Sequence, residues 1–259
     1  MLTIRLLALV LVGLFAATAR AANIDPDRPE LTESAKLLRT GFVQLESGLG
    51  FSHERRGGLA AEKTFEAQAD LRIGLLHDVE LNLGWAPLVS VWGPEDATGV
   101  DCVTLGVRYR FVEGIEDEPW PPHLAVKVFA KLPAMGEPIG TGRPDFGVLL
   151  LGSFELPHDF ELEVNVGAAA IGQTRPNRFL AQAIATASLS RDITQSMLGF
   201  LELLFNSRDE HDGREHFAVN VGLVYRLTRN LVIDAGFQTS VAGRGPDYVA
   251  RTGLSVLWR

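Results

Sequence analysis

The stretch LVIDAGFQTSV, Leu231 to Val241, decides the fold of this chain. Its odd positions are mostly apolar, whereas the even positions include the polar residues Asp234, Gln238 and Ser240. Successive side chains of a β-strand point to opposite faces, so this alternation predicts a strand with one apolar and one polar face.

The same period of two recurs along most of the chain. Strands of this length suit a tilted strand that crosses a bilayer, which needs roughly 9–11 residues in the apolar layer, and bacterial single-chain barrels have an even number of strands. We therefore predict an all-β fold, an antiparallel transmembrane β-barrel of about 12 strands. The expected strands are roughly 41–53, 64–76, 79–91, 101–112, 123–132, 145–156, 160–171, 179–190, 195–206, 215–227, 230–241 and 247–259.

The connections between these segments alternate in length. Tight turns are expected at His77-Asp78, Pro157–Asp159, Arg191–Thr194 and Thr228–Asn230, with longer polar loops between them. Short turns at one end and long loops at the other are typical of outer-membrane barrels. One connection departs from this rule, because Glu113–Pro122 is long and falls on the short-turn side.

A soluble secreted β-sandwich or a lipocalin-like barrel would also show alternating strands. Such domains have shorter strands, with turn residues about every 8–12 residues. Here the polar face carries glycines and charges of both signs, which suits a hydrated barrel interior. Closure into a barrel also leaves no unpaired strand edge. The pattern therefore favours the membrane barrel.

Residues 1–21 have the features of a secretory signal peptide. Arg5 precedes an apolar run, Leu6–Ala17, and Ala19-Arg20-Ala21 forms a small-x-small cleavage site. The uncharged stretch is too short for a spanning helix, which needs about 20 residues. We expect export, with a signal peptide at 1–21, an N-terminal periplasmic or plug segment at 22–40 and the outer-membrane barrel at 41–259.

Composition and motifs exclude several functional classes. The chain of 259 residues has a net charge of −8, which argues against a nucleic-acid partner, and its single cysteine, Cys102, cannot form an internal disulfide. No zinc, Walker or G-x-S-x-G motif occurs, and adjacent Ser52 and His53 would point to opposite strand faces. His211 and His216 lie in an acidic stretch that is better read as a charged surface loop than as a cation site. We expect no enzyme activity and no catalytic, cofactor-binding or metal-binding residues.

The polar faces of the predicted strands define a candidate lumen. Two interpretations remain open: a salt-bridged interior that fills a narrow barrel, or opposed charged walls that set up a field across a pore. The lumen-lining candidates are Glu46, Glu66, Asp70, Arg72, Glu80, Arg108, Arg110, Lys127, Lys131, Glu161, Glu163, Leu198, Phe200, Glu202, Arg226, Asp234 and Arg251.

Part of the inward face is apolar. Apolar side chains are poorly placed in a water-filled lumen, so we expect them either to line a path for an apolar solute or to pack against an internal plug. Residues 22–40 could supply that plug through Leu31, Leu37 and Leu38. The apolar inward residues are Leu149, Leu151, Ile184, Leu198, Phe200 and Leu204.

Three stretches resemble one bacterial family. DRPELTE at Asp27–Glu33, GFVQLESG at Gly41–Gly48 and the tail Gly245–Ser255 resemble the opening and ending of the outer-membrane proteins named for the MetA pathway of phenol degradation. The resemblance implies an outer-membrane barrel of transporter or channel type without an established substrate, and it assigns no binding residues. One departure is that Arg259 follows Trp258, whereas such barrels usually end in an aromatic residue.

These observations predict an outer-membrane channel of a Gram-negative bacterium that passes small solutes, apolar or aromatic ones among the candidates, by diffusion. Two alternatives remain: a closed structural barrel with a salt-bridged lumen, and a barrel lipid hydrolase. The expected partners are outer-membrane lipid and lipopolysaccharide, the barrel-insertion machinery and an unidentified small solute. No cofactor is expected.

Overall fold

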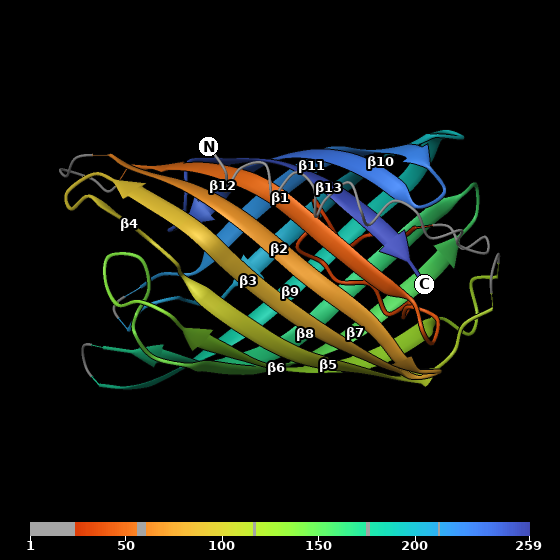
Figure 1. The fold of residues 1–259 in the computed structure, drawn as a ribbon, viewed down its shortest axis with the longest axis horizontal. Coiled ribbons are helices and arrows are strands. Elements are labelled where there is room, and N and C mark those ends of the chain that lie inside the picture. The colour runs from red at the N-terminus through yellow and green to blue at the C-terminus, as the bar shows by residue number, and fades with distance from the viewer. Residues whose placement is uncertain (1–23, 56–60, 116–117, 175–176, 212) are drawn as a thin grey trace, which may run out of the picture.

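The computed structural model describes residues 24–55, 61–115, 118–174, 177–211 and 213–259. The predicted signal peptide lies outside these residues. Twelve long antiparallel strands and one short strand form a single sheet that closes on itself (Figure 1). The strand that follows the N-terminal segment pairs with the last strand of the chain, for example Val43 with Trp258. The prediction of a closed, twelve-stranded antiparallel barrel is therefore confirmed.

The strands of the barrel are long. All but β4 have between 10 and 17 residues, which is enough for a tilted strand to cross a bilayer. The described residues contain no helix long and apolar enough to cross a membrane. The strands are β1 (Val43–Glu54), β2 (Glu62–Leu76), β3 (Val79–Trp92), β4 (Ala97–Gly99), β5 (Cys102–Val112), β6 (His123–Pro133), β7 (Asp145–Leu156), β8 (Phe160–Gln173), β9 (Arg178–Thr194), β10 (Met197–Asn206), β11 (His216–Thr228), β12 (Leu231–Gly243) and β13 (Tyr248–Trp258).

Alternation along each strand separates an apolar outside from a polar inside. On β5, Leu105 and Tyr109 are 48% and 52% exposed, whereas Arg108 is 2% exposed. An apolar exterior around a polar interior is the arrangement of a barrel whose outer face contacts lipid. Because each of the twelve long strands has two hydrogen-bonded neighbours, the barrel wall leaves no open sheet edge to lipid in the described residues.

The two ends of the barrel differ as expected. At one end, here called the turn end, β2–β3, β7–β8, β9–β10 and β11–β12 are joined by short turns. The long connection between Val112 and His123 also lies there. Longer loops join the strands at the opposite end, here called the loop end (Figure 1, left).

One predicted turn was wrong. Residues Arg191–Thr194 continue β9, and the turn lies at Gln195 and Ser196. Sheet pairing outweighs local turn propensity here, because Arg191 pairs with both Phe160 and Gly199. The Arg191 guanidinium also lies over the Phe160 ring, 5.0 Å from its centroid.

A β-bulge in β3 changes which residues face inward. Ala67 pairs with Leu88 but Ala69 pairs with Trp85, so β3 has an extra residue at this point. Beyond the bulge Val89 and Val91 are buried, and they form an apolar cluster with Ala86 near the loop end, packed against Ile139. The sequence analysis did not predict this inward apolar patch. The loop expected at 92–100 also contains β4, which pairs with Val89–Val91.

Candidate functional site

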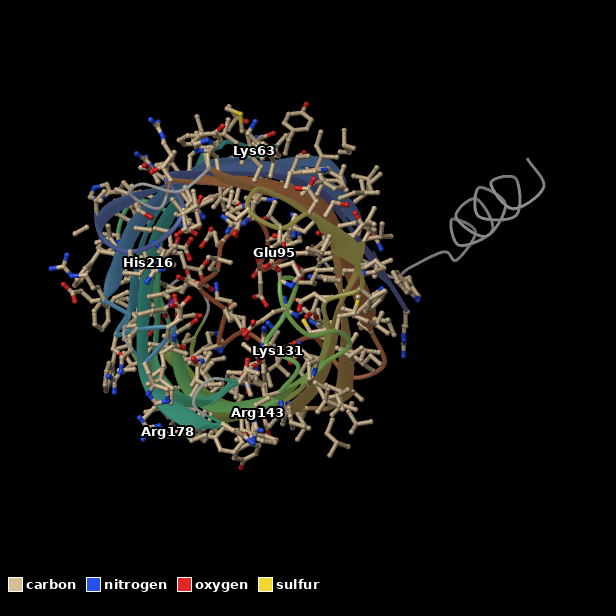
Figure 2. All side chains as sticks on the ribbon, turned by 90° about the vertical axis from the view of Figure 1, so that its left-hand side faces the viewer. Lys63, Glu95, Lys131, Arg143, Arg178 and His216 are labelled. Atoms are coloured by element: carbon tan, nitrogen blue, oxygen red, sulfur yellow. The ribbon has the colours of Figure 1, made fainter. Side chains whose placement is uncertain are left out.

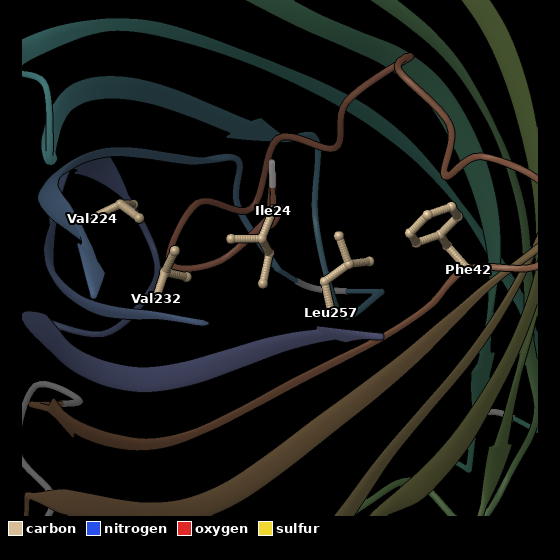
Figure 3. Packing of buried hydrophobic residues seen from close by; sticks show 5 residues of the cluster. All are labelled: Ile24, Phe42, Val224, Val232 and Leu257. Atoms are coloured by element: carbon tan, nitrogen blue, oxygen red, sulfur yellow. The ribbon is translucent and has the colours of Figure 1, made fainter. Parts of the chain in front are cut away.

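Residues 24–42, here called the lumenal segment, lie inside the barrel in the half near its turn end (Figure 1). The segment forms neither helix nor strand. Its two ends meet in one apolar cluster, where Ile24 and Phe42 group with Val224, Val232 and Leu257 of the barrel wall (Figure 3). Burial of these side chains fixes both ends of the segment close to the wall.

Backbone N–H groups of the lumenal segment donate to side chains of the wall. The Arg28 N–H donates to Glu46 at 3.0 Å, and the Leu38 N–H donates to Glu80 at 2.8 Å. Glu202 accepts from the N–H groups of Leu31 and Thr32, at 2.8 and 2.5 Å. Buried N–H groups require acceptors, and here ionisable side chains replace the partners that a helix or sheet would supply.

A charged cluster joins the segment to β2, β3, β5 and β6. Arg108 contacts the carboxylates of Asp27 and Glu33, the latter at 2.6 Å. Arg72 lies 3.2 Å from Asp27 and 2.9 Å from Glu80, and Lys127 lies 2.6 Å from Glu33. The basic side of the predicted lumen therefore takes many of its counterions from the N-terminal segment.

These cations hold the acids of the segment in the charged form. Burial opposes ionisation of Asp27, but Arg108 and Arg72 outweigh it and hold the pKa of Asp27 well below its usual range. Burial likewise opposes ionisation of Glu33, yet Lys127 and Arg108 lower its pKa. Both carboxylates are therefore ionised at neutral pH and contribute charge-assisted hydrogen bonds to docking.

Arg28 extends from the segment towards β1, β12 and β13. Its guanidinium donates to the Thr252 carbonyl at 3.2 Å, and its Nε lies 3.7 Å from Asp234. Glycines make room for it, because a Cβ at Gly48 would collide with the guanidinium and one at Gly253 would lie 2.7 Å from Nε. Gly48 and Gly253 pair across β1 and β13, so together they form a recess for one arginine side chain.

The DRPELTE stretch lies in the lumenal segment, and the GFVQLESG stretch leads from the segment into the barrel wall. In the first stretch, Asp27, Arg28, Thr32 and Glu33 each contact the wall through their side chains. The second stretch supplies Glu46, which accepts from the Arg28 N–H, and Gly48, which makes room for its guanidinium. The two motifs thus form the two sides of one interface inside the barrel.

A cavity of about 750 Å³ opens at the loop end. Figure 2 looks into this end and shows Glu95 and Lys131 near the middle of the opening. Acids outnumber bases around the cavity, so cations are expected to be concentrated at this entrance. Its charged lining residues are Glu62, Glu95, Asp101, Lys131, Glu137, Arg143, Asp145, Asp209 and Glu210.

A second cavity, of about 600 Å³, opens at the turn end beside the lumenal segment. It is continued by a narrow opening of about 30 Å³ between the segment and strands β8 to β11. The two spaces share Ile24, Asp25, Glu161 and Arg226 in their linings. We call the smaller space the narrow opening.

The structure places the lumen-lining candidates on the inward strand faces. Several of them contact the lumenal segment directly: Glu46, Arg72, Glu80, Arg108, Lys127, Glu161, Glu202 and Asp234. Others pair within the wall or near its ends: Arg110 with Asp78, Lys131 with Asp101, Arg226 with Asp192, Arg251 with Gln238, and Glu163 with Ser153. The remaining four lie beside inward glycines or the apolar cluster: Glu66, Asp70, Leu198 and Phe200.

Two groups of inward apolar residues pack against the lumenal segment. Leu149 and Leu151 cluster with Ala35 of the segment, with Ile184 packed against them, and Leu198 packs against the Ile24 cluster. Leu38 also packs there, whereas Leu31 is 48% exposed and does not serve as the apolar anchor that was expected. Ile24, Ala35 and Phe42 are the buried anchors, and the sequence analysis did not single them out.

The histidines make no metal site in the described part of the chain. There, no group of three or more His, Cys, Asp or Glu side chains is arranged to hold a metal ion. His211 lies 3.1 Å from the Arg178 guanidinium, and His216 lies 2.8 Å from the Ser240 hydroxyl. His53 contacts Asp247 at 3.1 Å and stacks on Tyr248.

Comparison with known proteins identifies the family. A family model described as "Putative MetA-pathway of phenol degradation" matches residues 26–258. The chain belongs to this family. The match of this phenol-degradation family begins within the lumenal segment, so the segment belongs to the family pattern along with the barrel. No protein of curated function matches the sequence.

Solved structures share the fold of this family member at low sequence identity. An outer-membrane channel from Pseudomonas putida F1 is similar with a TM-score of 0.65 and 14% identity, over 91% of this chain and 100% of that chain. The KdgM porin, in complex with disordered oligogalacturonate, is similar with a TM-score of 0.53 and 9% identity, over 82% and 99%. The β domain of the Bordetella autotransporter BrkA has a TM-score of 0.51 and 10% identity, over 83% and 98%. Barrels of this size therefore serve different functions, so the function has to be inferred from the residues of the lumen and not from the fold alone.

Proposed function

We propose that this protein is an outer-membrane channel through which small solutes cross by diffusion. The observation that carries the proposal is the lumen itself. A cavity of about 750 Å³ opens at the loop end, and one of about 600 Å³ opens at the turn end and continues inwards as the narrow opening. The similarity to an outer-membrane channel from Pseudomonas putida F1 supports this function, as does membership of the phenol-degradation family.

Small apolar or aromatic molecules are the solute class that we propose. Apolar side chains reach the interior at both ends, with Val89 and Val91 near the loop end and Leu198 beside the narrow opening. The hydroxyl group of Ser190 lines the narrow opening together with Leu198, and Ser190 of β9 pairs with Phe200 of β10. Such a wall suits a solute with an apolar body and one polar group. The name of the family supports the same class.

The proposal includes the cellular setting. We infer that residues 1–21 direct export and are removed, and that the barrel-insertion machinery places the chain in the outer membrane among lipid and lipopolysaccharide. We further propose that the protein is not an enzyme, in agreement with its structural similarity to channels and porins. The N-terminal segment at 22–40 is proposed to act inside the lumen and not in the periplasm.

Single-channel recording in planar bilayers tests this function. The purified mature chain should give discrete conductance steps, and proteoliposomes should swell in small phenols and aromatic acids faster than in sugars of similar size. Absence of both signals from the wild-type chain, and from a chain that lacks the lumenal segment, would identify a closed structural barrel. Release of fatty acid from phospholipid by the same preparation would instead identify a hydrolase.

A further inference from the structure

The lumenal segment and the narrow opening occupy the same cross-section of the barrel on opposite sides. On one side, charged groups of β2, β3, β5 and β6 hold the segment against the wall. On the other side, the segment faces β8 to β11 across the opening. The segment therefore divides the turn-end half of the lumen into a closed side and an open side.

The closed side is densely bonded. Arg72 and Arg108 are each no more than 2% exposed, and both contact acids of the segment. On the adjoining strand β7, Ser153 accepts from the Ala35 N–H at 2.9 Å. Withdrawal of the segment would leave these buried charges without their counterions, and breaking a buried ion pair from one side costs about 3–5 kcal/mol.

The open side is bonded to the segment as well, because Glu202 accepts from the Leu31 and Thr32 N–H groups, Asn165 accepts from the Glu33 N–H and Lys36 pairs with Glu161. A space remains among these contacts, and it has its own lining. Glu30 and Ser34 of the segment face Glu163, Ser190 and Leu198 of the wall across the opening. The opening has about 30 Å³, and one water needs roughly 10–15 Å³ of such space. It therefore has room for water as it stands, and a larger solute requires contacts on this side to move.

We propose that the lumenal segment is a fixed part of the channel, and that solutes pass between it and strands β8 to β11, where Glu163 and Leu198 select them. This inference rests on the proposed channel function and locates its filter. When ionised, the acidic side chain selects against anions, and the apolar side chain admits the apolar body of a solute. The segment acts as one wall of the filter and is not a plug that leaves during transport.

A disulfide between the segment and its closed side tests whether the segment is fixed. Ser34 and Ser153 suit this test, because their hydroxyl oxygens are 3.3 Å apart. The variant is Ser34→Cys with Ser153→Cys, and Cys102→Ser removes the natural thiol. The matched control is the same protein after reduction. We expect equal conductance in the oxidised and reduced states, and a several-fold larger conductance when residues 24–40 are deleted.

The outcomes separate the two hypotheses. Loss of conductance on oxidation, restored by reduction, would overturn the fixed segment, as would a silent wild-type channel that conducts only after the deletion. If neither the wild-type chain nor the deletion variant conducts in any state, the channel function itself fails.

Substitutions of the wall test the route independently. Leu198→Ala should raise the conductance about two-fold or more, and Leu198→Trp should reduce it to less than half. The control is Leu151→Ala, which removes the same atoms from an inward position that packs against Ala35 on the closed side. A larger effect from Leu151→Ala than from both Leu198 variants would place the route on the other side of the segment.

Discussion

Lys127 of β6 and Glu33 of the lumenal segment form an ion pair in which Nζ lies 2.6 Å from Oε1 and 2.7 Å from Oε2. The pair joins residues 94 positions apart, and Arg108 contacts the same carboxylate. Glu33 therefore neutralises two cations of the wall at once, as Asp27 does with Arg72 and Arg108, and its removal should weaken docking.

We expect Glu33→Gln to loosen the segment. Loss of the charge leaves Lys127 and Arg108 short of a counterion, at a cost of about 3 kcal/mol. Ser34 is 5% exposed, so a cysteine at this position reports opening through its reaction with a soluble thiol reagent. In a Cys102→Ser background, the reaction should be about 100-fold faster in Glu33→Gln, since 1.4 kcal/mol is a factor of ten. Glu95→Gln in the loop-end cavity is the control, and an equal rate in both variants would contradict the prediction.

Glu163→Gln should lower the preference of the channel for cations at alkaline pH, where the acids of the narrow opening are ionised. Carboxylates outnumber the single arginine around the narrow opening, where Asp25, Glu30, Glu161 and Glu163 face Arg226. Charged side chains at the narrowest point of a channel set its ion selectivity. The reversal potential in a potassium chloride gradient should therefore move towards zero, and Glu163→Lys should move it further. Glu118→Gln on the exposed turn-end connection should leave it unchanged.

The cation preference should also depend on pH through Glu30. Burial, with smaller contributions from Glu202 and Asp25, raises the pKa of Glu30 to about 8. A carboxyl with a raised pKa is neutral below that value and charged above it, so Glu30 adds negative charge as the pH rises from 7 to 9. The reversal potential should report a stronger cation preference at pH 9, and Glu30→Gln should remove part of this change, because Glu161 and Glu163 line the same opening. An identical pH profile in the variant would assign the titration to another group.

Gly48→Ala should destabilise the barrel more than Gly50→Ala on the same inward face. The new Cβ at position 48 meets the Arg28 guanidinium and the Thr252 carbonyl, whereas at position 50 it meets only the flexible Glu66 side chain. Displacement of Arg28 removes hydrogen bonds to a charged group, worth about 1.5–3 kcal/mol each. Urea unfolding from lipid vesicles should show this difference in unfolding free energy. Equal stabilities would mean that Arg28 can dock elsewhere.

Much of the barrel was predictable because its signal is local. The alternation at Leu231–Val241 depends only on neighbouring residues, and the structure gives β12 almost the same bounds. Parity also assigned Arg108 and Glu202 to the inside without any knowledge of their partners. The prediction failed where a distant strand decides: β9 runs past Arg191 because β8 and β10 pair with it. The bulge that turns Val89 inward likewise depends on the pairing of β3 with β2.

The lumenal segment was harder to predict, although its residues were noticed. Asp27 and Glu33 were seen as part of a family pattern, but their partners in the wall lie far along the chain, at Arg72, Arg108 and Lys127. A segment without periodic structure carries no pattern that points to such contacts. The expectation that Leu31, Leu37 and Leu38 would anchor it rested on hydrophobicity alone; Leu38 packs against the Ile24 cluster, whereas Leu31 is exposed. Charged groups hold its middle, and apolar residues hold its ends.

The recess for Arg28 has a consequence for biogenesis. Its walls come from β1 and β13, the first and last strands to be synthesised, and these meet only when the cylinder is sealed. The complete set of acceptors for this arginine therefore does not exist at any earlier stage of assembly. The final seating of the N-terminal residues therefore follows the joining of the seam, so that docking of this end marks a barrel that has matured.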